Sequence, residues 1–322
     1  MKKVSFVLPL YNEQEVIEVF HSTLLAECEL HEYEYNFIYV NDGSTDSSLE
    51  KLLEIRALDG RVTVLNFSRN FGHEMAITAG LDFANEMNVD AVCIMDTDLQ
   101  DPPHVALSMI ERWNEGVDVV YAQRRRRSSE SIIRKTLSHG FYWMLTAIAE
   151  SNIPPHTSDF RVIDSKVLKS VVKYREQSRY IRGIISDTGY TQEAYLFDRA
   201  ERYAGESHYN LKKLVSLAFE AIFGFSTAPL RLISKVGLFI SMLALLYGGF
   251  AVFQKFFMPE IVRLPGYTFL IVVILGLSGV QMLMLGAISS YVGRIFREVQ
   301  GRPLYLMESI SHTPQPTTNG KD

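Results

Sequence analysis

Residues 91–103 read Ala-Val-Cys-Ile-Met-Asp-Thr-Asp-Leu-Gln-Asp-Pro-Pro, so a short apolar run is followed at once by carboxylates and a carboxamide. A run of this length, bounded by residues that favour turns, is typical of a strand buried in a parallel sheet. Two earlier segments follow the same plan: residues 4–8, apolar apart from Ser5, precede Pro-Leu-Tyr-Asn-Glu, and residues 35–40 precede Asn-Asp-Gly-Ser-Thr-Asp. The sequence therefore predicts three strands that each end in a polar cluster.

Helical segments separate the strands over the same part of the chain. The expected order is strand Val4–Leu8, helix Glu13–Cys28, strand Tyr35–Val40, helix Ser47–Leu58, strand Val62–Phe67, helix His73–Asn85 and strand Ala91–Met95. This alternation predicts an α/β fold with a mostly parallel, Rossmann-like sheet, in which ligands bind beyond the carboxyl ends of the strands. No Gly-x-Gly-x-x-Gly follows the first strand, so the dinucleotide-binding version of this sheet lacks its phosphate-binding loop.

The composition limits the classes of protein and partner that fit. The chain has 322 residues, 47% of them hydrophobic and 21% charged, which excludes disorder as the main state. A formal net charge of −5 argues against a nucleic-acid partner. Cys28 and Cys93 fall in a predicted helix and a predicted buried strand, so we expect neither a disulfide framework nor a zinc site. The first apolar run is too short for a signal peptide, and we expect a cytoplasmic N-terminal domain.

Hydropathy sets the end of the chain apart from its beginning. Residues 236–254 and 267–292 each approach or exceed the ~20 apolar residues that span a bilayer, and neither contains Asp, Glu, Lys or Arg. The alternative is a pair of helices buried in a soluble core. Basic residues before the first span and after the second place both ends of this hairpin on the cytoplasmic side. The sequence therefore predicts an integral membrane protein with both termini in the cytoplasm.

The expected organisation has four parts. They are a cytoplasmic domain over residues 1–210, an amphipathic juxtamembrane helix over 211–230, a two-span anchor over 231–298 and a cytoplasmic C-terminal tail over 299–322. Residues 211–225 and 132–148 mix basic and large apolar side chains, which fits helices in the membrane interface, although ordinary core helices are the alternative. Residues 309–322 are polar, with two prolines, and predict a mobile end.

Asp96 and Asp98 are separated by one residue directly after a predicted buried strand. Two carboxylates so placed can reach one small, hard cation, and Mg²⁺ or Mn²⁺ prefers such oxygen ligands, shared with substrate phosphates and water. As a bare pattern, Asp-x-Asp is more often a turn or a helix cap. The position after a strand favours the metal site.

Six segments of this chain form a set that recurs in one family of enzymes. They are Val7–Glu13, Val40–Asp46, Phe67–Gly72, Met95–Pro103, Ser158–Arg161 and Arg202–Tyr209, followed by the predicted anchor. With them the chain resembles the family 2 glycosyltransferases of the GT-A fold, in the group that makes polyprenyl-phosphate sugars. It is similar to dolichyl-phosphate mannosyltransferases and more so to bacterial and phage undecaprenyl-phosphate glucosyltransferases. The resemblance covers nearly the whole chain and specifies the sugar poorly.

The resemblance implies roles for individual residues. Residues that hold the nucleotide are expected at Pro9, Tyr11, Glu13, Asp42 and Ser44. The metal on the donor diphosphate would be surrounded by Asp96, Asp98 and Gln100. Contacts to donor or lipid phosphates fall at Arg124, Arg134, Ser138 and Arg202, although the basic run 124–127 could also be plain solvated surface. Asp159 matches the proposed catalytic carboxylate.

The resemblance also implies the reaction and the partners. A UDP-sugar, with glucose as first choice and N-acetylglucosamine as second, would give its hexose to undecaprenyl or another polyprenyl phosphate, with inversion, at the bacterial inner membrane. Mg²⁺ or Mn²⁺ would neutralise the departing diphosphate. The acceptor phosphate has a second pKa near ~6 and is largely ionised already, so Asp159 either takes the residual proton or aligns the acceptor. A homotetramer is expected by resemblance, and glycines in the spans allow close helix approach.

Two other interpretations stay open. A processive family 2 polysaccharide synthase would keep the fold, but such enzymes typically carry a Gln-x-x-Arg-Trp motif, which this sequence lacks. A nucleotide-binding membrane scaffold with a decayed catalytic site would be no enzyme at all. Intact carboxylates at Asp96, Asp98 and Asp159 argue against the scaffold.

Overall fold

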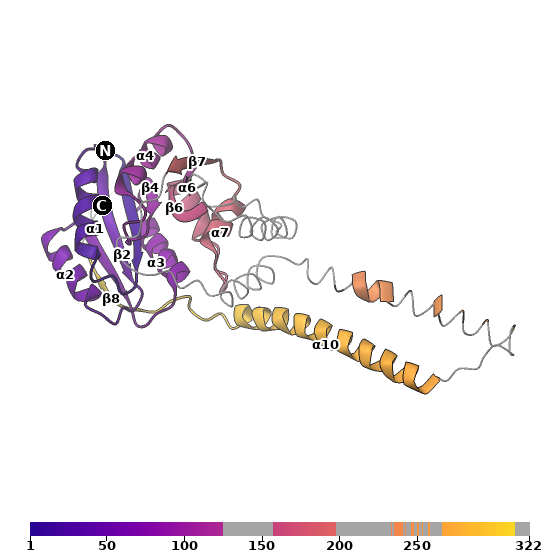
Figure 1. Cartoon of the computed structure of the whole chain (residues 1–322). Coiled ribbons are helices and arrows are strands. Elements are labelled where there is room, and N and C mark those ends of the chain that lie inside the picture. The colour runs from indigo at the N-terminus through magenta and orange to yellow at the C-terminus, as the bar shows by residue number, and fades with distance from the viewer. Residues whose placement is uncertain are drawn as a thin grey trace, which may run out of the picture. The chain divides into compact units, whose positions relative to one another are not determined.

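The computed structural model describes residues 1–124, 157–197 and 266–312, together with scattered positions between 233 and 257. The chain divides into two compact units. One unit contains all the strands that the structure describes, and the other contains the long helix α10 (Figure 1).

An eight-stranded mixed sheet forms the centre of the first unit (Figure 1). The strands are β1 (Lys3–Leu10), β2 (Glu34–Asn41), β3 (Val62–Phe67), β4 (Ala91–Ile94), β5 (Val119–Arg124), β6 (Thr157–Asp164), β7 (Gln192–Phe197) and β8 (Met307–Ser311). They lie in the order β7-β5-β6-β4-β1-β2-β3-β8. Strands β4, β1, β2 and β3 run parallel, as do β5 and β7, whereas β6 and β8 are antiparallel to their neighbours. The predicted, mostly parallel α/β sheet is confirmed.

Helices cover both faces of this sheet (Figure 1). They are α1 (Ile17–Cys28), α2 (Ser48–Leu58), α3 (His73–Glu86), α4 (Pro103–Asn114), α6 (Ser165–Val171) and α7 (Ile181–Asp187). Successive side chains of a strand point to opposite faces. Phe6 accordingly packs in a buried cluster with residues of α1, α2 and α4, and Val7 packs in a second cluster with residues of α3, α6 and α7. The unit is therefore a three-layer α/β/α structure.

The elements predicted over residues 4–95 agree with the structure to within two residues at each end, except that α1 begins at Ile17 instead of Glu13. The backbone N–H of Glu13 donates to Ser48 Oγ at 2.9 Å, and that of Gln14 donates to Asp46 Oδ2 at 3.3 Å. Asp46 and Ser48, at the start of α2, thus accept the N–H groups of the segment that precedes α1. Residues 13–16 form a turn beside the site instead.

The C-terminal segment differs from the prediction of a tail over residues 299–322. Met307–Ser311 form β8, which pairs antiparallel with β3 at the edge of the sheet. An edge strand offers unpaired backbone groups that a returning segment can satisfy, whatever the polarity of its side chains. Residues 313–322 lie outside the described part of the chain.

The second unit contains α10 (Gly266–Val299), a helix of 34 residues that includes the predicted second span. Large apolar side chains on it are exposed, among them Leu277 at 48% and Met282 at 70%. None of the helices in the described part of the chain meets the length and apolarity needed to cross a membrane. The first predicted span is described only at scattered positions, and segments 211–225 and 132–148 lie outside the described residues. The four-part division of the chain stays a prediction.

Candidate active site

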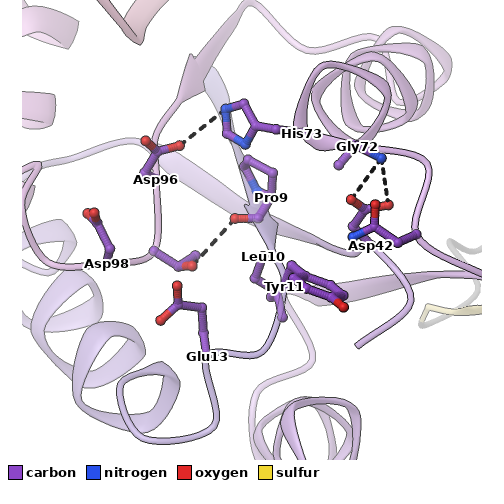
Figure 2. Close-up of a pocket in the computed structure, with 12 residues that line it drawn as sticks. Pro9, Leu10, Tyr11, Glu13, Asp42, Gly72, His73, Asp96 and Asp98 are labelled. Atoms are coloured by element: carbon purple, nitrogen blue, oxygen red, sulfur yellow. Dashed lines mark hydrogen bonds and ion pairs between the residues drawn. The ribbon is translucent and has the colours of Figure 1, made fainter. Parts of the chain in front are cut away.

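Loops at the carboxyl ends of β1, β2 and β4 meet the start of α3 around one pocket, which has a volume of about 430 Å³ (Figure 2). The pocket is lined by Pro9, Leu10, Tyr11, Glu13, Asp42, Asn70, Gly72, His73, Ala76, Asp96, Thr97 and Asp98. The three polar clusters seen in the sequence therefore come together here, because the carboxyl ends of parallel neighbouring strands share one edge of the sheet.

The first two loops are tied by each other's side chains. Asn12 has a left-handed φ of 56°, and its backbone N–H donates to Ser44 Oγ at 2.9 Å. In return, the N–H of Thr45 donates to Asn12 Oδ1 at 2.8 Å. This turn presents Tyr11 and Glu13 to the pocket (Figure 2). Ser44, predicted among the nucleotide contacts, does not line this pocket; its hydroxyl joins the two loops.

Asp42 lies at the pocket but is only 3% exposed, and its carboxylate is engaged by the loop before α3. It accepts the N–H of Phe71 at 2.7 Å. It also accepts the N–H of Gly72 at 2.9 Å, as Figure 2 shows. Gly43 lets this loop approach, because it has a φ of 64° and a Cβ there would lie 2.4 Å from the carbonyl carbon of Arg69. Asp42 thus fixes where α3 begins.

Of the three predicted metal ligands, Asp96 and Asp98 line the pocket and Gln100 does not. Asp98 Oδ1 accepts the backbone N–H of Gln100 at 3.0 Å, and the Gln100 side chain is buried, with no hydrogen-bond partner for Nε2 in the described part of the chain. Two carboxylates beside an open pocket fit Mg²⁺ or Mn²⁺ that takes its other ligands from a diphosphate and water. Among the described residues, no group of three or more His, Cys, Asp or Glu could hold a metal by itself.

Asp159 approaches the same place from β6. Because β6 is antiparallel to β4 and Arg161 is opposite Ile94, Asp159 lies beyond the end of β4, where Asp96 follows. His73 lies between the two carboxylates, with Nε2 at 3.5 Å from Asp96 Oδ1 and at 3.7 Å from Asp159 Oδ2. The imidazole therefore links the predicted metal site with the predicted catalytic carboxylate.

Cations surround Asp159. Arg182 Nε lies 2.8 Å from Oδ1, and its Nη2 donates to Oδ2 at 3.1 Å. Burial acts to raise the pKa of Asp159, but His73 and the guanidinium groups of Arg182 and Arg161 outweigh it and lower this pKa to about 2. Burial conversely acts to lower the pKa of His73, but the carboxylates of Asp159 and Asp96 raise it to about 9. Both side chains are charged at neutral pH.

Helix α3 positions both partners of Asp159. His73 is its first residue, and the next residue, Glu74, accepts the N–H of Ile181 at 2.9 Å through Oε2. That bond holds the first turn of α7, which carries Arg182. Sequence reasoning assigned no role to His73 or Arg182. His73 directly follows one of the matched segments and could have been found, but no motif marks Arg182.

The structure leaves four predicted phosphate contacts largely undescribed. Arg124 is the last residue of β5, where only its backbone is described, and Arg134, Ser138 and Arg202 lie outside the described residues. Their roles stay predictions.

A second pocket, of about 450 Å³, shares Tyr11 and Asn70 with the first. Its remaining lining residues are Asn41, Gly43, Ser44, Thr45, Leu49, Asn66, Phe67, Ser68, Arg69 and Glu308. Glu308 comes from β8, so the C-terminal segment contributes directly to this part of the molecule.

Comparison with known proteins places this chain in a family. The model of Glycosyl transferase family 2 matches residues 5–172, which is more than half of the chain. An uncharacterized glycosyltransferase, YkcC of Bacillus subtilis, is 40% identical over 94% of this chain and 93% of its own. Another uncharacterized glycosyltransferase, sll0501 of Synechocystis, is 38% identical over 96% of this chain and 95% of its own. The bactoprenol glucosyl transferase of Shigella phage SfII is 38% identical over 98% of this chain and 100% of its own. With a matching family model and relatives aligned over almost its full length, the chain belongs to glycosyltransferase family 2.

Proposed function

We propose that this chain transfers a hexose, with glucose as first choice, from a UDP-sugar to a polyprenyl phosphate. Proteins of Shigella phages SfII, SfV and SfX that are named bactoprenol glucosyl transferases are 38%, 38% and 37% identical to it, over 98%, 95% and 95% of its length. Bactoprenol is a polyprenol, so these names support both a lipid acceptor and glucose as the sugar.

The observation that carries the proposal is the pocket in which Asp96 and Asp98 lie beside Tyr11 and Glu13. The two carboxylates would hold Mg²⁺ or Mn²⁺, which neutralises charge on a departing nucleoside diphosphate. Tyr11 and Pro9 offer apolar surface to a base, and Glu13 offers acceptors for ribose hydroxyls. We assign the nucleotide to this pocket, with Asp42 and Ser44 shaping the loops around it.

The reaction needs little proton transfer from the protein. A phosphate oxygen of the lipid forms a bond to the anomeric carbon, and the bond from that carbon to the diphosphate oxygen breaks with its electron pair. A single displacement of this kind inverts the anomeric carbon. The acceptor phosphate is already largely ionised at neutral pH, since its second pKa is near ~6. Positioning and charge stabilisation therefore dominate over base catalysis.

Asp159 fits the aligning role better than the base role. A carboxylate whose pKa is about 2 is a weak proton acceptor at neutral pH. Its pairing with Arg182 and His73 instead fixes two cations near the pocket. Arg124, Arg134, Ser138 and Arg202 are proposed to add contacts to donor or lipid phosphates.

We also propose that the chain is anchored in the bacterial inner membrane by the hairpin over residues 231–298, with the enzymatic domain and both termini in the cytoplasm. Supporting observations are the absence of charged residues from 267–292 and the exposed apolar side chains of α10. A lipid acceptor would then be reached at the membrane surface. The homotetramer remains a proposal by resemblance.

The test is transfer by the detergent-purified full chain, supplied with Mn²⁺, undecaprenyl phosphate and radiolabelled UDP-glucose or UDP-N-acetylglucosamine. We expect label in the extracted lipid with the wild type, and about 100-fold less with Asp96→Ala or with EDTA, because charge stabilisation of the leaving group is lost. Glu54→Gln, an exposed carboxylate on α2, is the matched control and should keep full activity. Label in polymer would favour a synthase, and label only in water would exclude the lipid acceptor.

A further inference from the structure

Strand β8 carries one residue that its ladder with β3 leaves unpaired. Asn66 is opposite Ser309 and Phe67 is opposite Met307, so Glu308 is the extra residue on β8. A bulge of this kind bends its strand locally and redirects the extra side chain. Here the Glu308 carboxylate meets Asn66, whose Nδ2 donates to Oε2 at 2.9 Å.

A chain of hydrogen bonds continues from Glu308 into the loops of the active site. Asn66 Oδ1 accepts from Asn41 Nδ2 at 2.7 Å, and Asn41 Oδ1 accepts the backbone N–H of Ser44 at 3.3 Å. Ser44 Oγ in turn accepts the N–H of Asn12 at 2.9 Å. Asn66 and Asn41 are 4% and 1% exposed, so little water competes for the bond between their side chains at the centre of this chain. This series of hydrogen bonds thus runs from the C-terminal strand to the residues flanking Tyr11 and Asp42.

Glu308, at the outer end of this series of hydrogen bonds, decides which group of each amide donates and which accepts. An ionised carboxylate only accepts hydrogen bonds, whereas a carboxamide can present either its oxygen or its NH₂ group. Facing Glu308, Asn66 must present its NH₂ group, which leaves its oxygen for the NH₂ group of Asn41. Asn41 is then left with its oxygen toward Ser44 N–H. A reversed Asn66 would oppose two acceptors at Glu308. Asn41 would then either face it with a second donor or reverse as well, and its reversal would take the acceptor from the Ser44 N–H.

We propose that Glu308 is a positioning residue for the nucleotide donor: by orienting the Asn66 and Asn41 amides, it holds the 41–45 loop in its binding conformation. This inference rests on the proposed function, because it requires a nucleotide at the neighbouring pocket. Glu308, Asn66, Asn41 and Ser44 also all line the second pocket beside Tyr11, so the chain of bonds forms the wall next to the donor site. The C-terminal segment therefore takes part in donor binding without touching the reacting atoms.

The test is a comparison of four full-length proteins: wild type, Asn66→Asp, Glu308→Gln and the double variant. Asn66→Asp places a second carboxylate opposite that of Glu308, so that two hydrogen-bond acceptors face each other. It should raise the Kd for UDP roughly three- to tenfold, measured by calorimetry with Mn²⁺. Glu308→Gln alone should have a smaller effect, because a carboxamide can still accept. The double variant should bind UDP within about twofold of Glu308→Gln, because the new carboxylate at position 66 accepts from both neighbours.

Kinetics distinguish positioning from a general loss of structure. The KM for the donor should follow the Kd values, while kcat stays within about twofold of wild type, since only donor binding is weakened. Ser309→Ala, an exposed neighbour on β8, is the matched control and should behave as wild type. Equal binding by Asn66→Asp and the double variant, or no effect of Asn66→Asp, would overturn the inference. A wild type that binds no UDP would overturn the proposed function and this inference with it.

Discussion

At the scale of single residues, burial and neighbouring charges act on Asp159 in opposite directions. The carboxylate is 8% exposed, and burial alone would favour its protonated form. Arg182 and His73 keep it ionised, and it in turn holds both cations, of which His73 also meets Asp96. Of the two roles expected for Asp159, taking the residual proton or aligning the acceptor, these contacts favour the second, because the carboxylate holds charges near the pocket.

Removal of Arg182 should change the pH dependence of the reaction. In Arg182→Ala one fewer cation opposes burial, so the pKa of Asp159 rises from about 2. Activity that needs the ionised carboxylate is lost as the pH falls through that pKa, and the acid limb of kcat/KM therefore moves to higher pH. We expect the ratio of activity at about pH 5 to that at about pH 7.5 to fall several-fold, and Arg182→Lys to change it less. An unchanged ratio in Arg182→Ala would contradict this role.

Gly43→Ala tests the close approach of two loops. A Cβ at Gly43 would lie 2.4 Å from the Arg69 carbonyl carbon, and φ is 64°, so the variant suffers both a backbone clash and a strained dihedral. We expect a loss of about 2–3 kcal/mol in the free energy of unfolding and weaker binding of UDP. Gly189→Ala is the matched control: its φ of 74° is similar but its Cβ would meet open space, so it should lose only about 1 kcal/mol and bind UDP normally. Equal losses in thermal unfolding would argue against the clash.

At the scale of elements, β8 and the residues before it are packed onto the first unit by side chains as well as by the strand ladder. The Tyr305 ring stacks on Phe67 with centroids 5.3 Å apart, and its hydroxyl donates to Asp82 Oδ2 at 2.7 Å. Arg175 donates to the same carboxylate, and Gln177 Nε2 donates to the Arg302 carbonyl at 2.6 Å. The C-terminal segment is therefore part of the folded unit rather than an appendage.

Two variants of Tyr305 should separate its ring from its hydroxyl. Tyr305→Phe keeps the stacking on Phe67 and loses one hydrogen bond, which should cost about 1 kcal/mol. Tyr305→Ala loses the ring contact too and should cost about 2–3 kcal/mol, less than a fully buried aromatic because Tyr305 is half-buried. Thermal unfolding of the detergent-purified chain measures both. If Tyr305→Ala unfolds like the wild type, the segment does not stabilise the unit.

At the scale of the whole molecule, the proposed anchor makes a prediction that does not depend on activity. Membranes from cells that produce the chain would be washed with alkaline carbonate, which releases peripheral proteins. A hairpin with an uncharged stretch such as 267–292 should stay with the membranes and be released only by detergent. Recovery of the chain in the carbonate supernatant would contradict the anchor while leaving the proposed reaction standing.

The sequence by itself determined the local features of this protein. The central strands, the helices between them and the loops that hold Tyr11, Asp42 and Asp96 were predicted, because apolar periodicity and turn-forming residues act over a few neighbouring positions. The convergence of those loops also followed, since parallel neighbouring strands end at one edge. Family membership followed from the same short motifs.

Only the tertiary structure decided which distant residues complete the site. Arg182 meets Asp159 from 23 positions away, and Glu308 meets Asn66 from 242 positions away. Neither contact has a sequence period or a turn signal, because each depends on how distant elements pack. Glu74 of α3 holds the start of α7, which carries Arg182, and β8 covers the open edge of β3. Gln100 lies outside the pocket for a related reason, since its backbone closes the turn at Asp98 while its side chain is buried. Packing between elements, which no local pattern encodes, fixed these positions.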